Sequence, residues 1–208
     1  MDHTSTLLSV AALWTLAVLT PGPNFLVTVR LAGGRSRAAG LQGVAGIGVG
    51  TLAWAGAGCL GVQALFTAAP WAYAALKLGG GAYLLLTGAR LLLARGGDGA
   101  GADALPDGAR AAGAGPFWAG LATNLANPKS ALFMAGIFAA AMPPQPPPGL
   151  ALGAMAVMAG ISVCWYGLVA CLLSTRALLG AYRRGRRWVD RVAGACFVLF
   201  GARLLISR

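Results

Sequence analysis

Pro21-Gly22-Pro23-Asn24 interrupts one long apolar stretch of this chain, and Asn127-Pro128-Lys129 interrupts another. Proline inside a helix removes a backbone hydrogen bond and clashes with the preceding turn. In a lipid bilayer the freed backbone groups have no water to bind, so such breaks survive only where protein buries them or where they line a cavity. Paired breaks in the two halves of a membrane protein indicate a transporter's binding site. The two stretches therefore predict both a fold class and the place of a site.

The composition places these stretches in a membrane. Of the 208 residues, 58% are hydrophobic and only 10% are charged, whereas a soluble domain carries about 25% charged residues. The uncharged blocks also exceed the roughly 20 residues that a spanning helix needs. We predict an all-α integral membrane protein with six transmembrane helices, at about residues 5–29, 40–66, 70–93, 116–141, 150–173 and 188–206.

Two segments of the sequence repeat one another. Gly81–Leu92 reads Gly-Ala-x5-Gly-Ala-Arg-Leu-Leu, and Gly194–Leu205 has the same pattern. The repeat relates the third helix to the sixth, and three spans is an odd number, so the second half enters from the opposite side. This predicts two inverted three-helix repeats, residues 1–93 and 116–208, which a cytoplasmic linker loop at 94–115 connects.

Basic residues mark the loops on one side of the membrane. The net charge is +11, but the basic residues form no single patch, so we expect no nucleic-acid partner. Eleven arginines fall in three alternate loops, against two at the C-terminus, and this bias places those loops in the cytoplasm and both termini outside. The cluster at 183–187 is also a candidate for binding anionic lipid head groups. The eleven are Arg30, Arg35, Arg37, Arg90, Arg95, Arg110, Arg176, Arg183, Arg184, Arg186 and Arg187.

The two breaks offer ligands of both signs. Freed N–H groups suit a carboxylate, and freed carbonyls suit a cation. Asn24 and Asn127 add amides that can both donate and accept. Lys129 brings a positive charge near mid-membrane, where charge is costly and usually functional. The predicted substrate-binding residues are Pro21, Gly22, Pro23, Asn24, Asn124, Asn127, Pro128 and Lys129.

Four more residues are candidates for a gate or for coupling. Lys77 lies in the third helix, and its repeat mate is Asp190 at the cytoplasmic start of the sixth. Either could exchange partners as the halves move, and structural anchoring is the alternative for both. Thr51 and Tyr83 complete the set as weaker candidates on the second and third helices.

The sequence contains no set of residues for catalysis or metal binding. The four cysteines form no C-x-x-C pair, and the single histidine is His3. A nucleophile with its base, or a group of metal ligands, is therefore missing. We expect neither an enzyme, nor a metal site, nor a cofactor.

The motifs resemble those of the LysE/RhtB family of amino-acid exporters, nearly end to end. Thr20–Asn24 is similar to the family's first-helix motif, Leu76–Leu92 to its third-helix segment, and Thr123–Ala131 to its fourth-helix motif. The resemblance implies six helices in the bacterial inner membrane and proton-coupled efflux of amino acids or close derivatives. It supports a site role for Pro21, Pro23, Asn24, Asn127, Pro128 and Lys129.

The second helix departs from the family pattern. Many relatives carry an acidic or histidine residue where this chain reads Gly50–Trp54, which leaves the predicted core without a group that titrates near neutral pH. A dibasic substrate would also need a buried carboxylate for its extra cation. Our hypothesis is therefore a small neutral substrate of the threonine, homoserine or leucine type, moved by alternating access of the two halves.

Two alternatives remain open at this point. A metal-ion or small-cation exporter of the same superfamily would need buried Asp, Glu or His ligands, which the predicted core lacks. A non-transporting membrane assembly subunit would tolerate loss of Asn24, Asn127 and Lys129. The sequence does not decide whether the chain forms a homo-oligomer.

Overall fold

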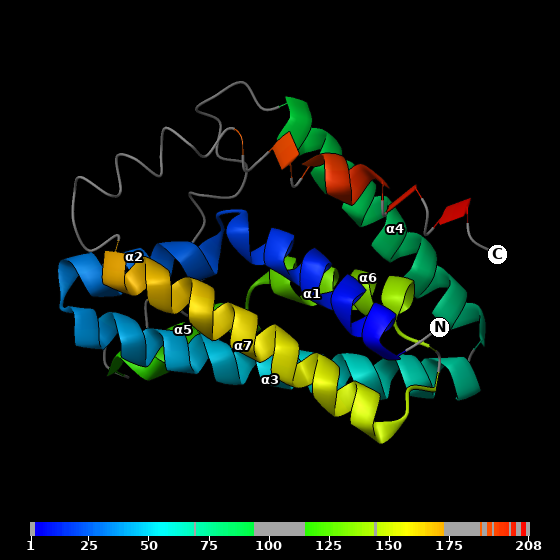
Figure 1. Cartoon of the computed structure of the whole chain (residues 1–208), viewed down its shortest axis with the longest axis horizontal. Coiled ribbons are helices and arrows are strands. Elements are labelled where there is room, and N and C mark those ends of the chain that lie inside the picture. Colours follow the sequence, from blue (N-terminus) through cyan, green and yellow to red (C-terminus); the bar gives the residue numbers. More distant parts are fainter. Residues whose placement is uncertain are drawn as a thin grey trace.

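The computed structural model is all-helical throughout the residues that it describes. These are residues 3–68, 70–93, 115–143, 145–172, 188, 191–192, 194–199, 201–202 and 205–206. The helices are α1 (His3–Leu19), α2 (Pro23–Gly34), α3 (Arg37–Ala68), α4 (Pro70–Leu93), α5 (Gly115–Leu125), α6 (Pro128–Ala141) and α7 (Pro148–Leu172). Short helical segments between 194 and 206 follow them (Figure 1).

Proline determines where two of these helices begin. Pro23 opens α2 and Pro128 opens α6, and proline is favoured at this position because the missing N–H would have no partner there anyway. α1 and α2 are bent by 57° at their break. At the second break, the side-chain oxygen of Asn127 caps α6 by accepting a hydrogen bond from the backbone N–H of Lys129 at 3.0 Å. Each predicted interruption is therefore a helix end followed by a new helix start.

The surface of the longest helices is apolar. Among the described residues, Arg37–Gly61 and Pro148–Leu172 are each long and apolar enough to cross a membrane, and the bent pair α1–α2 counts as a third candidate. Large apolar side chains such as Leu60 and Leu152 are exposed, whereas polar side chains such as Asn124 and Ser162 are buried. A helix that is apolar all round fits a lipid environment. The described part of the chain is thus all-helical, and its apolar surface is that of a membrane protein.

α3 lies against α5 along a face of glycines. A Cβ atom at Gly46 would collide with the carbonyl oxygen of Phe117 and lie 2.7 Å from the backbone nitrogen of Leu121. On the other side of the contact, a Cβ at Gly120 would collide with the backbone of Gly43. The two backbones therefore touch, which is the use that membrane helices make of small residues.

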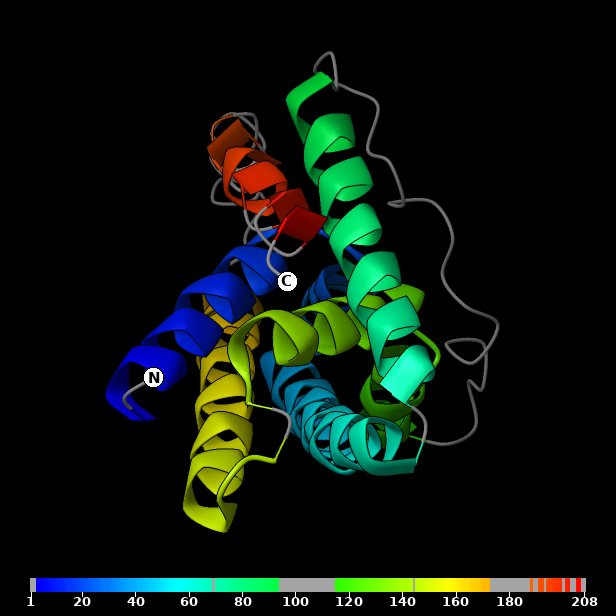
Figure 2. The same ribbon diagram turned by 90° about the vertical axis from the view of Figure 1, so that its right-hand side faces the viewer.

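Glycines also bring α4 close to the segments between 194 and 206, which lie beside it (Figures 1 and 2). A Cβ at Gly81 would lie 3.3 Å from the carbonyl oxygen of Gly201, and a Cβ at Gly201 would lie 2.7 Å from that of Gly81. A Cβ at Gly88 would lie 2.6 Å from the carbonyl oxygen of Gly194. Both members of the sequence repeat thus contact each other through their glycines.

The glycine contact between α3 and α5 predicts a large effect of one methyl group. Gly46→Ala is expected to lower stability by about 1–3 kcal/mol or more, because α5 must move to admit the methyl. Thermal unfolding of the detergent-solubilised protein measures the change. The matched control is Gly160→Ala on α7, where a Cβ meets nothing within 4 Å. Equal unfolding temperatures for the two variants would contradict the close contact.

Candidate functional site

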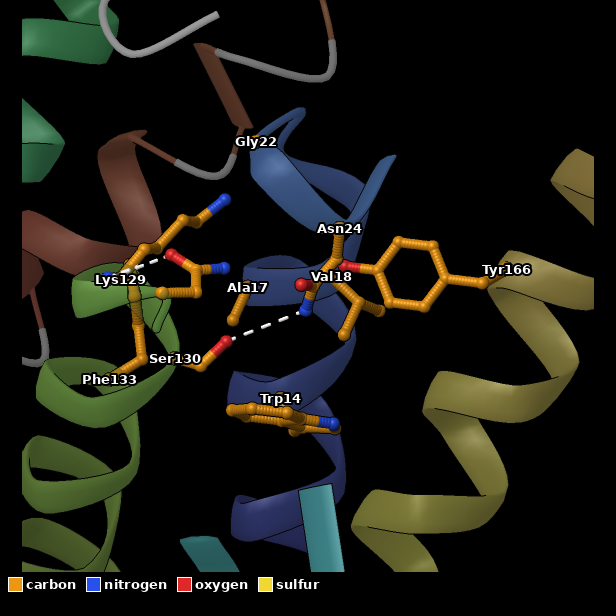
Figure 3. A pocket seen from close by; sticks show the side chains of 10 residues that line it. Trp14, Ala17, Val18, Gly22, Asn24, Lys129, Ser130, Phe133 and Tyr166 are labelled. Carbon is orange, nitrogen blue, oxygen red and sulfur yellow. Dashed lines mark hydrogen bonds between the residues drawn. The ribbon is translucent and has the colours of Figure 1, made fainter. Parts of the chain in front are cut away.

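A pocket of about 300 Å³, counting its open mouth, lies where the two helix breaks meet (Figure 3). Its walls come from α1, α2, α6 and α7. The lining residues are Trp14, Ala17, Val18, Gly22, Asn24, Asn127, Lys129, Ser130, Phe133 and Tyr166.

Lys129 carries its ammonium group from α6 across to the end of α1. Nζ donates a hydrogen bond to the carbonyl oxygen of Thr20 at 2.6 Å. Nζ also lies 5.7 Å from the centre of the Phe133 ring, within the range of a cation–π interaction. Gly22 borders the ammonium group, since a Cβ there would lie 3.6 Å from Nζ. A cation at the C-terminal end of a helix is favoured by the helix dipole.

Asn24 provides an acceptor that has no donor within the described structure. Its side chain is only 5% exposed, and its Nδ2 donates a long hydrogen bond of 3.5 Å to Ser130 Oγ. Its Oδ1 is buried and accepts no hydrogen bond from any described residue. Such an orphan acceptor costs about 1–3 kcal/mol. Because Asn24 lines the pocket, a ligand that donates a hydrogen bond would remove this cost.

Helix ends of both signs meet at the pocket. The N-termini of α2 and α6 carry partial positive charge and suit an anion, and the ammonium of Lys129 lies near both. The C-terminal end of α1 carries partial negative charge, which the carbonyl of Thr20 presents. Ala17 and Val18 supply an apolar wall. The pocket therefore combines a positive side, a negative side and a small apolar side.

A second buried polar cluster adjoins the pocket and joins α1, α3, α5 and α7. Trp14 Nε1 donates to Ser162 Oγ at 2.9 Å, and Ser162 Oγ lies 3.4 Å from Thr51 Oγ1. Asn124 Nδ2 also donates to Thr51 Oγ1 at 3.4 Å. The hydroxyl of Thr51 in turn donates to the carbonyl of Ile47 at 2.9 Å. Trp14 is shared by the cluster and the pocket, so the cluster fixes the orientation of one pocket wall.

The structure separates the predicted substrate-binding residues into three groups. Gly22, Asn24, Asn127 and Lys129 line the pocket. Asn124 instead pairs with Thr51 in the adjoining cluster, where Trp54 Nε1 also donates to its carbonyl at 3.2 Å. The prolines shape the breaks, with Pro21 inside the first break and the others opening α2 and α6: Pro21, Pro23 and Pro128.

Several predicted features lie outside the described residues. These are Asp190, residues 94–114 of the predicted linker, the basic stretch at 183–187, and the side chains of Lys77 and Tyr83. Thr51 is the gate candidate that the structure does describe, in the polar cluster.

The structure also adds residues that sequence reasoning missed. Trp14, Ser130, Phe133 and Tyr166 line the pocket, and the backbone carbonyl of Thr20 binds Lys129. Ser162 and Tyr166 stand four residues apart on an otherwise apolar helix, and this spacing places them on one face. That pair was the available signal that α7 faces a polar interior.

Comparisons with known proteins identify the family of the chain. The model of a family described as LysE type translocator matches residues 15–208. The threonine efflux protein of Escherichia coli (strain K12) is 32% identical over 201 residues, covering 97% of this chain and 98% of that protein. The threonine efflux protein of Salmonella typhi is 31% identical over 200 residues, covering 96% and 97%.

A more distant relative is an uncharacterized membrane protein of Haemophilus influenzae, 25% identical over 204 residues that cover 97% of this chain and 96% of that protein. No solved structure matches the chain. Because the family match spans both helix breaks, and the threonine efflux proteins align over nearly their whole length, the chain belongs to the LysE type translocators, which are transporters and not enzymes.

Proposed function

We propose that this protein exports small neutral amino acids, threonine among them, from the cytoplasm of a bacterium across its inner membrane. The observation that carries the proposal is the pocket between the two breaks, where positive and negative groups face one small space beside an apolar wall. Relatives that are threonine efflux proteins support both the substrate class and the direction.

A zwitterion matches the pocket group by group. The carboxylate would bind at the helix N-termini of α2 and α6 and to the ammonium of Lys129, since these groups favour an anion. The substrate ammonium would donate to the carbonyl of Thr20 and to the orphan Oδ1 of Asn24. A short side chain would lie against the apolar wall that includes Ala17 and Val18.

The charges of the pocket argue against the competing substrates. Its lining, within the described part of the chain, includes no Asp or Glu to accept the second cation of lysine or arginine. A metal-ion exporter would need a group of hard or borderline ligands, and no three His, Cys, Asp or Glu side chains gather among the described residues. A non-transporting assembly subunit would have no need of an orphan acceptor in a pocket.

We propose that the chain forms two inverted halves, residues 1–93 and 116–208 with the linker 94–115 between them, which rock about the pocket in alternating access. The glycine contacts support this arrangement. In the sequence repeat, Gly81 corresponds to Gly194 and Gly88 to Gly201, and the contacts pair Gly81 with Gly201 and Gly88 with Gly194. The repeat counterparts of Gly81 and Gly201 are therefore Gly194 and Gly88, which form the other contact. A two-fold axis between the halves requires this relation.

The helix contacts follow the same relation. In the proposed repeat, α3 corresponds to α7 and α5 corresponds to α1. The contact between α3 and α5 should then have a counterpart between α7 and α1, and both contacts are present. Likewise, α3 contacts α6 as α7 contacts α2. The proposal also has three secondary parts. These are proton coupling, anionic lipid bound at 183–187, and a gate that includes one or more of Lys77, Asp190, Thr51 and Tyr83.

Proteoliposomes loaded with equal concentrations of the twenty standard amino acids test the substrate class. Threonine and other small neutral amino acids are expected to leave selectively and saturably, and mass spectrometry of the external medium measures their release. Protein-free vesicles are the control, with and without a pH gradient. Lysine or arginine leaving more efficiently than every neutral amino acid would contradict the substrate class, and no selective release at all would contradict amino-acid export.

The contact between Asn24 and Ser130 predicts an effect on affinity. Ser130→Ala removes the acceptor that orients the Asn24 amide, so the apparent affinity for threonine should fall about fivefold, corresponding to roughly 1 kcal/mol. Saturation curves of efflux measure it. Ser9→Ala is the matched control, because Ser9 does not line the pocket and its hydroxyl donates to the carbonyl of Ser5 within α1. Identical curves for both variants would remove Asn24 from the binding site.

The proposed topology predicts where the C-terminus lies. Alkaline phosphatase fused after Arg208 should be active, because it folds only outside the cytoplasm, and a fluorescent protein at the same place should stay dark. The same two reporters fused after Gly97, in the proposed cytoplasmic linker, should behave oppositely. A bright fluorescent fusion after Arg208 with a dark one after Gly97 would reverse the orientation, whereas the same result at both positions would rule out the inverted halves.

A further inference from the structure

The contact between Lys129 and Thr20 occupies the best cation position in the pocket. Thr20 is only 6% exposed, and its carbonyl directly follows the end of α1, where helix carbonyls lack partners and carry partial negative charge. The ammonium of Lys129 lies 2.6 Å from this oxygen, although it comes from α6. The position therefore already holds a primary ammonium group from the protein itself.

A substrate ammonium is the same chemical group as the end of a lysine side chain. Both are primary ammonium ions with three donors and no acceptor, so both favour the carbonyl of Thr20. Two ammonium ions cannot share one carbonyl at hydrogen-bond distance without strong repulsion in a site of low dielectric constant. Lys129 and the substrate ammonium therefore compete for the same oxygen.

A displaced Lys129 would need a new partner, and a carboxylate bound in the pocket could supply it. Figure 3 shows Lys129 and Asn24 on opposite walls, so a ligand between them lies within reach of both. Gly22 lies beside the lysine stem, and a Cβ added there would make only ordinary contact, 3.4 Å from Lys129 Cδ. The flexible four-carbon stem of lysine can then turn its charge to a carboxylate.

We propose that Lys129 is a tethered cation that occupies the substrate's ammonium position, the carbonyl of Thr20, whenever the transporter is empty. When an amino acid binds, its ammonium takes the carbonyl and the orphan Oδ1 of Asn24, and Lys129 moves to the carboxylate. No charge is left without a partner in either state, and uncompensated charge in a membrane core is costly. The inference rests on the proposed amino-acid export. It adds how the transporter, after releasing its substrate outside, returns without substrate to the state that faces the cytoplasm.

A comparison of two transport modes tests this inference. Net efflux into substrate-free medium requires the empty transporter to return, whereas exchange of labelled for unlabelled threonine at saturating concentration on both sides does not. In Lys129→Gln, the ratio of net efflux to exchange is expected to fall at least tenfold below that of the unmodified protein. Ser130→Ala is the matched pocket control, which should change affinity but leave this ratio unchanged.

Each outcome separates the inference from the proposed function. An unchanged ratio in Lys129→Gln, with both modes reduced equally, would make Lys129 only a substrate ligand and overturn the inference, while amino-acid export would stand. No movement of any amino acid by the unmodified protein, in either mode, would overturn export itself and the inference with it.

A measurement on the unmodified protein covers the case in which Lys129→Gln does not fold. The amine 1-amino-2-propanol has the ammonium and hydroxyl of threonine but no carboxylate, so it could displace Lys129 only by leaving that charge without an anion. Its inhibition constant for threonine exchange is expected to be at least 100-fold weaker than that of unlabelled threonine. Inhibition as strong as that by threonine would overturn the tethered-cation mechanism.

Discussion

A helix that stops inside a membrane must satisfy its backbone ends within the protein, because lipid offers no hydrogen bonds. This constraint explains why α1 and α2 meet α5 and α6 at one place. The end of α1 is met by the ammonium of Lys129, and the start of α6 is capped by Asn127. The rest of the molecule covers these ends: α3 and α7 pack around them, with polar groups inside and apolar side chains outside.

The sequence was sufficient to predict the class of the protein and the residues at its centre. Prolines at 23 and 128 begin helices, and Asn24 and Lys129 face one pocket, because helix breaking and charge burial are local properties that a sequence displays. A sequence does not show which backbone atoms act as ligands, or which residues far apart in the chain form hydrogen bonds. The carbonyl of Thr20 has no sequence signature, and the partners Trp14 and Ser162 are 148 residues apart. Asn124 is another residue whose position the sequence does not display. Its motif predicted a place in the pocket, but its side chain packs against Gly50 and donates a hydrogen bond to Thr51.

Tryptophan links the two polar regions of the core. The indole of Trp14 forms part of the pocket wall, while its N–H is held by Ser162, which adjoins Thr51. A buried hydrogen-bond network of this kind couples the helices that contribute to it. The shape of the binding space therefore depends on α3 and α7 as well as on the broken helices, although α3 supplies none of the described lining residues.

The glycine contact between α3 and α5 has a mechanical consequence. These helices belong to different proposed halves, and their backbones touch where Gly46 meets Phe117 and Gly120 meets Gly43. Two surfaces without side chains between them cannot separate without opening a void, but they can turn against each other. A rocking motion would then have its fulcrum at this contact. The counterpart between α1 and α7 is joined through side chains instead, by a tryptophan–serine hydrogen bond, so a rotation there would have to break or carry along that bond.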